Sequence, residues 1–493
     1  MRLACPFALA LLGLTAGPSA ADLAALAGFD RSFVDATLRV DYLHGGDANE
    51  ESATLDRAYR QGTWAGSRVH LVDPAEVGRT LVEVRDSATG GLLFSRRSDS
   101  YFGEYRTTAE AAKGVRRLYH TTALVPFPKG KVRLSIKVRG KDRAHKTLLE
   151  TVVDPDSPLI GREPLRAGVS VIDVHRSGDP HGRADVAIVA EGYTSADEAK
   201  LRADLARYAA ILFGQEPFAS ARDRFNLVCV WAPSQDPGCD EPGRGVWRNT
   251  AVGASFDSLG SERYLLTEDN KALRDVAAHA PYDVLYIMVN SPRYGGGGIY
   301  NLFCTFTAGN QWSPYVFLHE FGHTFAALAD EYYTSSVAYN DFFPRGVEPI
   351  EPNVTALLDP ARLKWKDLAT PGTPVPTPWE KAPFDRMDVD YQELREALNA
   401  RIAAASRSDA PAADVDRLKA DAERLSVEHS ARMDAHLARS AYAGKVGAFE
   451  GAGYTSEGLY RPSLDCIMFS KGIKPFCPVC HRAVGRVIDY YGE

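Results

Sequence analysis

The sequence lacks three features that would each indicate a particular class of protein. It has no basic excess, since 57 lysines and arginines stand against 64 aspartates and glutamates in 493 residues. That balance argues against a general nucleic-acid-binding protein. Beyond the N-terminal segment, no apolar run approaches the roughly 20 residues of a transmembrane helix. With 45% hydrophobic and 25% charged residues the chain is not disordered, and its length predicts several domains.

Cysteine is scarce, and one of the seven lies in a segment that processing would remove. The chain begins with Arg2, a short apolar run and then small residues, which is the pattern of a secretory signal peptide over residues 1–21. Cleavage after Ala20 or Ala21 would remove Cys5 and leave a secreted or periplasmic protein. An even count in an oxidising compartment predicts disulfides. The remaining cysteines are Cys229, Cys239, Cys304, Cys466, Cys477 and Cys480.

Cys477-Pro-Val-Cys480 is the one C-x-x-C motif of the sequence. It is compatible with a redox pair, half of a zinc knuckle, or two structural cysteines. No second C-x-x-C completes a four-cysteine zinc site, and no thioredoxin-like βαβ pattern surrounds the motif. We therefore favour structural disulfides.

The segment 22–165 consists of short apolar-polar alternations separated by turns, which predicts an all-β sandwich that serves as an accessory or binding module. From 169 to 493 the pattern changes to buried apolar runs and an amphipathic helix, Ser195–Phe213, with Ser195 as N-cap. This order predicts an α/β domain with a mainly parallel sheet. The predicted buried strands are Asp185–Ala190, Phe225–Trp231 and Tyr282–Val289.

Residues 385–440 have a third composition, rich in Ala, Arg, Glu, Asp and Leu. Leu394, Leu398 and Ile402 recur at helical spacing before a break at 406–411, and a second helical pattern follows it. We predict a helical hairpin inserted into the catalytic domain. A solvated spacer is its simplest role, and a partner-binding arm is the alternative.

The segment Ser313–Asp330 contains H-E-x-x-H. Ser313 is a suitable N-cap and Pro314 suits the first helical position, so a helix is expected to begin there. His319 and His323 then lie one turn apart, opposite a buried apolar face, and can bind one zinc ion through their Nε2 atoms. Glu320 borders the metal, where it can take a proton from a zinc-bound water.

A catalytic zinc ion needs a third protein ligand and an open position for water. Asp330, seven residues after His323, is the first choice, because a sharp turn would return it to the metal. Glu331 is the second choice, and Glu450 is a more distant candidate.

The segment HEFGHTFAALADEYY (319–333) resembles the bacterial IgA-peptidase family of zinc metallopeptidases, which belongs with the metzincins. Further blocks that resemble this family extend from about Asp185 to the end of the chain. They are EGYT (191–194), YGGGGIYN (294–301), NVT (353–355), KWK (364–366), GAFEGAGY (447–454), YRP (460–462), CIM (466–468) and FCPVC (476–480).

The resemblance implies that His319 and His323 bind zinc, that Glu320 is the general base, and that Met468 forms the metzincin Met-turn beneath the metal. It also implies that Tyr294–Asn301 is an edge strand able to pair with an extended peptide. One departure concerns the third ligand. The common pattern places a glycine and a histidine where this chain has Ala326 and Ala329.

We therefore expect a secreted zinc-dependent endopeptidase, with Tyr332 or Tyr333 as a candidate for stabilising the oxyanion. A glycan- or protein-binding module with a structural or degenerate metal site is the alternative. Cell-wall peptide amidase chemistry is a weaker one. Specificity lies in the cleft, so the sequence leaves the substrate and the cleaved bond open.

Overall fold

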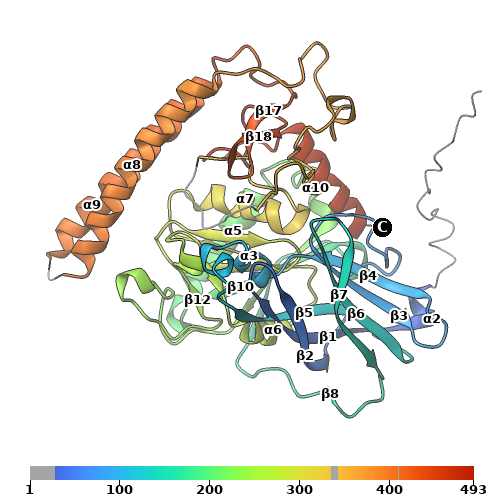
Figure 1. Ribbon diagram of the computed structural model, residues 1–493. Coiled ribbons are helices and arrows are strands. Elements are labelled where there is room, and N and C mark those ends of the chain that lie inside the picture. Colours follow the sequence, from blue (N-terminus) through green and yellow to red (C-terminus); the bar gives the residue numbers. More distant parts are fainter. Residues whose placement is uncertain (1–27, 335–341, 409, 493) are drawn as a thin grey trace, which may run out of the picture.

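The computed structural model describes residues 28–334, 342–408 and 410–492, arranged as two regions joined side by side (Figure 1). The predicted signal peptide, 1–21, lies outside the described residues. No helix within the described ranges combines the length and apolar character that crossing a bilayer requires.

The N-terminal region contains two four-stranded sheets that share one hydrophobic core. Apolar residues of both sheets face this core, as in Val40 and Val125 of one sheet and Val84 and Leu134 of the other. One sheet has the order β5 (Arg117–Pro128), β1 (Phe33–Gly46), β2 (Glu51–Arg60), β8 (Ile160–Gly161). The other has the order β4 (Leu92–Ser98), β3 (Thr80–Asp86), β6 (Val132–Arg139), β7 (His145–Val153). Three short helices accompany the strands: α2 (Phe29–Ser32), α3 (Tyr101–Tyr105) and α4 (Ala109–Ala112).

The second region is built on a six-stranded sheet whose four inner strands are parallel. Both edge strands run antiparallel to their neighbours. The inner strands are almost entirely buried, as their continuous apolar sequences predict. The order is β15 (Gly296–Ile299), β16 (Phe303–Thr307), β14 (Val284–Val289), β10 (Ala184–Glu191), β11 (Phe225–Trp231), β9 (Ser170–His175).

Helices cover both faces of this sheet. One core joins the sheet to α5 (Glu198–Leu212), α7 (Ser313–Ala326) and α10 (Pro478–Tyr491). The opposite core includes α6 (Asn270–Ala277) together with Tyr101, Phe102 and Tyr119 of the N-terminal region. The two regions therefore share a hydrophobic core. The small elements are η1 (Pro180–Gly182), η2 (Ser195–Asp197), η3 (Arg222–Arg224), η4 (Pro242–Arg244), η5 (Ser258–Gly260), η6 (Pro360–Arg362), β12 (Ala254–Ser255), β13 (Leu266–Thr267), β17 (Phe449–Ala452) and β18 (Thr455–Arg461).

Two long antiparallel helices, α8 (Lys381–Ser406) and α9 (Ala412–Leu437), form the arm at the left of Figure 1. Their contact is more polar than the leucine spacing predicts. Leu394 is 57% exposed, whereas His429 stacks on Tyr391 with ring centroids 3.9 Å apart and pairs with Asp388 at 2.8 Å.

Two predicted helix caps are wrong by one residue. Ser195 begins the 3₁₀ turn η2, and the capping box is formed by Thr194 and Asp197. For α7 the N-cap is Trp312, because the Oγ of Ser313 instead accepts a hydrogen bond from the N–H of Asn310 at 3.0 Å.

The predicted disulfides are absent from the described residues, where all six cysteines are free and buried. Cys229 and Cys304 lie within β11 and β16 and contribute to the sheet core as small apolar side chains. Cys466, Cys477 and Cys480 lie together without a bond, since the Sγ atoms of Cys466 and Cys480 are 3.9 Å apart.

Candidate active site

Helix α7 carries both histidines of the H-E-x-x-H motif. Its buried face packs on the sheet through Phe317, Phe321 and Phe325, as the helical spacing predicts. His319 and His323 point away from this face, and their Nε2 atoms are 3.1 Å apart.

The remaining nitrogen of each imidazole contacts a backbone carbonyl. Nδ1 of His319 lies 3.0 Å from the carbonyl oxygen of Ile467, and Nδ1 of His323 lies 2.5 Å from that of Leu328. Carbonyl partners of this kind keep the proton on Nδ1 and leave Nε2 able to bind a metal. The backbone thus fixes both rings in a ligand orientation.

Asp330 returns to the two imidazoles by the sharp turn that the sequence predicts. Ala327 ends α7 in the left-handed conformation, with φ 49°. The Oδ1 atom of Asp330 then lies 2.9 Å from Nε2 of His319 and 3.1 Å from Nε2 of His323. The other carboxylate oxygen accepts a hydrogen bond from the hydroxyl of Tyr454. Tyr454 closes the block GAFEGAGY, but its contact with Asp330 could not be predicted from the sequence, because the two residues are 124 positions apart.

The carboxylate of Asp330 and the imidazoles of His319 and His323 interact electrostatically in a way that suits the binding of a cation. Burial alone would raise the pKa of Asp330, but His323 and His319 hold that pKa well below its usual range. Burial would lower the pKa of His323, but the charge of Asp330 raises it to about 9. Ligand atoms about 2.1 Å from a tetrahedral zinc ion lie about 3.4 Å from one another. The observed separations need to widen only by a few tenths of an ångström, so the three residues fit zinc.

Glu320 lies next to this triad and lines the same cavity. Its carboxylate oxygen is within 4.8 Å of the metal-binding atoms of His319 and His323. Burial raises the pKa of Glu320, while the neighbouring imidazoles lower it in part. A carboxylate with a raised pKa beside a metal position is suited to accept and return a proton.

Four consecutive glycines bring strand β15 against α7. A Cβ atom at Gly296 would lie 2.5 Å from Cγ1 of Val316, and one at Gly298 would lie 2.8 Å from the carbonyl oxygen of Glu320. On the other face of the strand, a Cβ at Gly297 would meet the ring of Tyr264 at 2.4 Å. The strand therefore passes between two layers that leave no room for side chains.

The strand is an edge strand, as expected from the resemblance, but part of its outer edge is occupied. Gly296 accepts a hydrogen bond from the N–H of Leu265 at 3.2 Å and donates one to the carbonyl oxygen of Arg263 at 3.4 Å. Gly298 lies beyond this pairing.

Met468 packs beneath the site, against the glycine of the motif. Its thioether sulfur lies 2.9 Å from the position of a Cβ on Gly322, so any larger side chain there would displace it. Met468 is fully buried, and its carbonyl oxygen accepts a hydrogen bond from the N–H of Glu331 at 2.9 Å. Ile467, which contacts His319, directly precedes it.

The triad opens into a cavity of about 140 Å³. Tyr332 lines it and stacks on His319, with ring centroids 6.2 Å apart. The hydroxyl of Tyr333, by contrast, donates to Asp385 of α8 at 2.6 Å, away from the triad. Of the two tyrosines proposed for the oxyanion, only Tyr332 faces the cavity.

The other two candidates for the third ligand lie elsewhere. Glu331 is fully buried and faces Cys480, whose Sγ is 3.2 Å from its Oε1 atom. Glu450 lies on β17, where its Oε1 accepts a hydrogen bond from the N–H of Gly458 at 3.0 Å. Of the three candidate carboxylates, Asp330 is the one that the fold brings to both imidazoles.

A second, larger cavity adjoins the first. It has a volume of about 760 Å³ and shares Arg263, Tyr294, Tyr315 and Tyr332 with the smaller cavity. The helical arm forms one wall, because α8 and α9 contribute Tyr391 and His429 to it. The tip of the arm contacts a second part of the domain, where Arg407 donates to the carbonyl oxygen of Gly243 at 3.0 Å, next to the lining residue Arg244. The arm therefore bridges this cavity.

Comparison with known proteins agrees with the site. No curated protein matches the chain. Two family models do match, and together they cover both regions. The model described as Peptidase M64 N-terminus matches residues 28–150, and the model described as IgA Peptidase M64 matches residues 172–488, more than half of the chain. The chain therefore belongs to the IgA peptidase M64 family.

Proposed function

We propose that this peptidase is a zinc-dependent endopeptidase whose metal ligands are His319, His323 and Asp330. The observation that carries the proposal is the meeting of two Nε2 atoms and one carboxylate oxygen within 3.1 Å of one another. The second nitrogen of each imidazole is already engaged by backbone. We further propose a metzincin-like catalytic domain behind a β-sandwich, in a secreted or periplasmic protein.

When bound, zinc supplies Lewis acidity, which polarises a carbonyl group and lowers the pKa of water. Glu320 then takes the proton from the attacking water and passes it to the amine that leaves. Tyr332 lies beside His319, where its hydroxyl can donate to the developing oxyanion. Arg263 holds its guanidinium over the Tyr332 ring at 5.6 Å and so orients the phenol.

Strand β15, which lines the cavity of the triad, favours a peptide substrate that binds in extended form. The Gly298 end of β15 borders Glu320, and backbone pairing there would lay a peptide bond alongside the general base. The larger cavity continues from this point under the helical arm and can hold further residues of the substrate.

The binding-module alternative requires a degenerate site. The triad contacts, the intact Glu320 and the close-packed glycine strand all favour catalysis instead. A cell-wall peptide amidase would use the same metal ligands, so only the substrate distinguishes it from an endopeptidase.

The test is Glu320→Gln, which keeps the shape of the side chain and removes the base. We expect zinc content to stay at the wild-type level and hydrolysis of a peptide library to fall by about 10²–10⁴-fold. Wild-type activity in this variant would refute the mechanism. Loss of cleavage with chelator, restored by zinc, would exclude a binding module, and the cleaved sequences would separate an endopeptidase from an amidase.

A further inference from the structure

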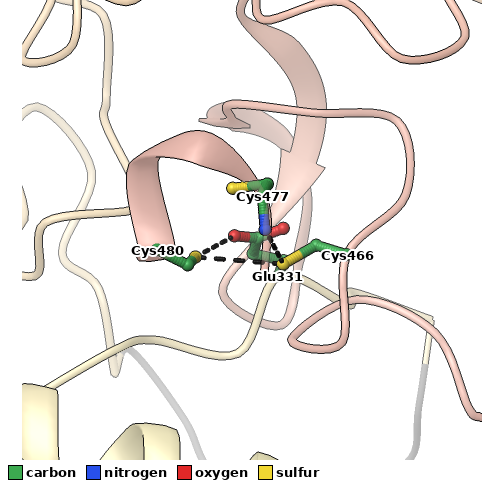
Figure 2. Close-up of side chains that lie close together, drawn as sticks. All are labelled: Glu331, Cys466, Cys477 and Cys480. Atoms are coloured by element: carbon green, nitrogen blue, oxygen red, sulfur yellow. Dashed lines mark hydrogen bonds between the residues drawn. The ribbon is translucent and has the colours of Figure 1, made fainter. Parts of the chain in front are cut away.

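Four side chains that can bind metal meet in the interior, behind the candidate active site. Glu331, Cys466, Cys477 and Cys480 each offer a ligand atom, and these atoms all lie within 4.8 Å of one another. All four residues are buried. Figure 2 shows the carboxylate of Glu331 between the sulfur atoms of Cys466 and Cys480.

The spacing of the sulfur atoms corresponds to ligands of one metal ion. The Sγ atoms of Cys466 and Cys480 are 3.9 Å apart. Sulfur atoms bound to a tetrahedral zinc ion at about 2.3 Å lie about 3.8 Å from each other. A disulfide bond would require about 2.05 Å.

The hydrogen bonds of the Glu331 carboxylate are a second, independent observation that indicates a bound cation. Its Oε1 atom accepts a hydrogen bond from the side-chain amide of Asn353 at 3.0 Å and one from the thiol of Cys480 at 3.2 Å. Its Oε2 atom is buried and has no hydrogen-bond partner among the residues that the structure describes. A buried carboxylate oxygen without a partner is costly, and a cation at the centre of the three sulfur atoms would satisfy this one.

We propose that Glu331, Cys466, Cys477 and Cys480 bind a second zinc ion, which has a structural role. Three thiolates favour zinc over calcium or magnesium, and four protein ligands leave no open position for water. The N–H of Cys477 points at the sulfur of Cys466 at 3.3 Å, a contact that supports a thiolate. The C-x-x-C motif supplies two ligands, Cys466 lies 11 residues before it, and Glu331 comes from a distant part of the chain.

This ion would hold together the elements that position the catalytic triad. Glu331 directly follows Asp330, and Cys466 directly precedes Ile467, whose carbonyl contacts His319. The segments already touch where the N–H of Glu331 donates to Met468. Cys477 and Cys480 add the first turn of α10. The metal would join these three segments directly behind the cleft.

Metal analysis of the full-length chain tests the proposal. We expect two zinc ions per chain in the wild type and one in His319→Ala, which lacks a ligand of the other site. Cys480→Ser should also retain one. Cys229→Ala is the matched control, because this buried cysteine lies in the sheet core outside the cluster, and it should retain two.

X-ray absorption of the zinc that remains in His319→Ala makes the test independent of whether Cys480→Ser folds. We expect zinc–sulfur distances of about 2.3 Å. One zinc in the wild type and none in His319→Ala would overturn the proposal. So would a denatured protein with two fewer titratable thiols than cysteines, which would show a disulfide. If the H-E-x-x-H site binds no zinc, wild type and His319→Ala would both carry one sulfur-ligated ion, and the proposed function alone would fail.

Discussion

Asp330 and Glu331 are neighbours in the chain, yet their carboxylates face two different clusters. Asp330 meets two imidazoles at the edge of a cavity, and Glu331 meets three thiols in the interior. An open set of three ligands suits catalysis, because a fourth position remains for the substrate. A closed set of four suits structure. The two clusters therefore differ in ligand number, in exposure and in the side chains that accompany the carboxylate.

Replacing Asp330 by Asn should have a larger effect on zinc binding and activity than the substitutions described below. The variant loses the charge that both imidazoles face, so we expect zinc affinity at this site to fall by more than about 100-fold, since loss of an outer-sphere partner alone costs 10–100-fold. Peptide hydrolysis should fall with it at limiting zinc.

Glu450→Gln is the matched control for this change, because that carboxylate lies on β17 outside the triad. Zinc titration of both variants checks the prediction. An Asp330→Asn protein with wild-type zinc affinity would show that the third ligand lies elsewhere.

Gly298→Ala should separate catalysis from metal binding. The added Cβ would lie 2.8 Å from the Glu320 carbonyl oxygen and 3.1 Å from its Oε2. Displacing the general base by about 1 Å can cost about 100-fold in rate, so we expect kcat to fall about 10- to 100-fold with zinc retained. Gly62→Ala is the control, because a Cβ there has open space. Equal kcat in the two variants would mean that β15 does not constrain the base.

Gly322→Ala tests the contact between the motif helix and Met468. The new Cβ would lie 2.9 Å from the sulfur of Met468, and such overpacking costs about 1–3 kcal/mol of unfolding free energy. Gly485 is also helical but has open space around it, so Gly485→Ala should instead stabilise by up to about 1 kcal/mol. Denaturant unfolding measures both, and equal stability of the two variants would contradict the assigned packing.

A buried pair of acids, Asp185 and Asp283, supplies a baseline for the two clusters. Burial raises the pKa of both Asp185 and Asp283, and within the described ranges each carboxylate has one oxygen without a hydrogen-bond partner. The folded state therefore holds more protons than the unfolded one above the unfolded pKa of about 3.9. Stability should fall as pH rises from there through the raised folded-state values.

Asp185→Asn removes one of these charges and lets its amide donate toward Asp283. We expect it to be more stable than the wild type above pH 7, by about 1 kcal/mol, the typical net value of one hydrogen bond. Asp156→Asn, at an exposed position, should change nothing. The melting temperatures of the two variants, measured from pH 4 to 9, test this prediction. If both variants show the same dependence of melting temperature on pH, the pKa of Asp185 is not raised.

The helices, strands and turns that depend on residues close together in the sequence could be predicted from it. The H-E-x-x-H helix, its apolar face and the return of Asp330 all lie within 18 residues, so helical periodicity and one sharp turn suffice to place them. The buried strands could be predicted because a strand covered on both faces is continuously apolar.

Contacts between distant segments could not be predicted in the same way. Tyr454 reaches Asp330 from β17 and β18, and Glu331 joins cysteines 135 to 149 positions away. The C-x-x-C motif suggested disulfides because its partners are a lone cysteine and a glutamate, which form no second motif. The helix faces of the arm could be predicted only in part, since Ile402 is buried whereas Leu394 is exposed and Asp388 pairs with His429 at the contact.

The opposite orientation of Asp330 and Glu331 limits how the chain can change in length. Adjacent side chains of a non-helical segment point to opposite sides, so deleting one residue between Ala327 and Asp330 would move both carboxylates out of their clusters. Glu331 would then face the imidazoles, and the cysteines would face Tyr332. Insertions between Ala327 and Tyr332 are therefore expected to disrupt both clusters.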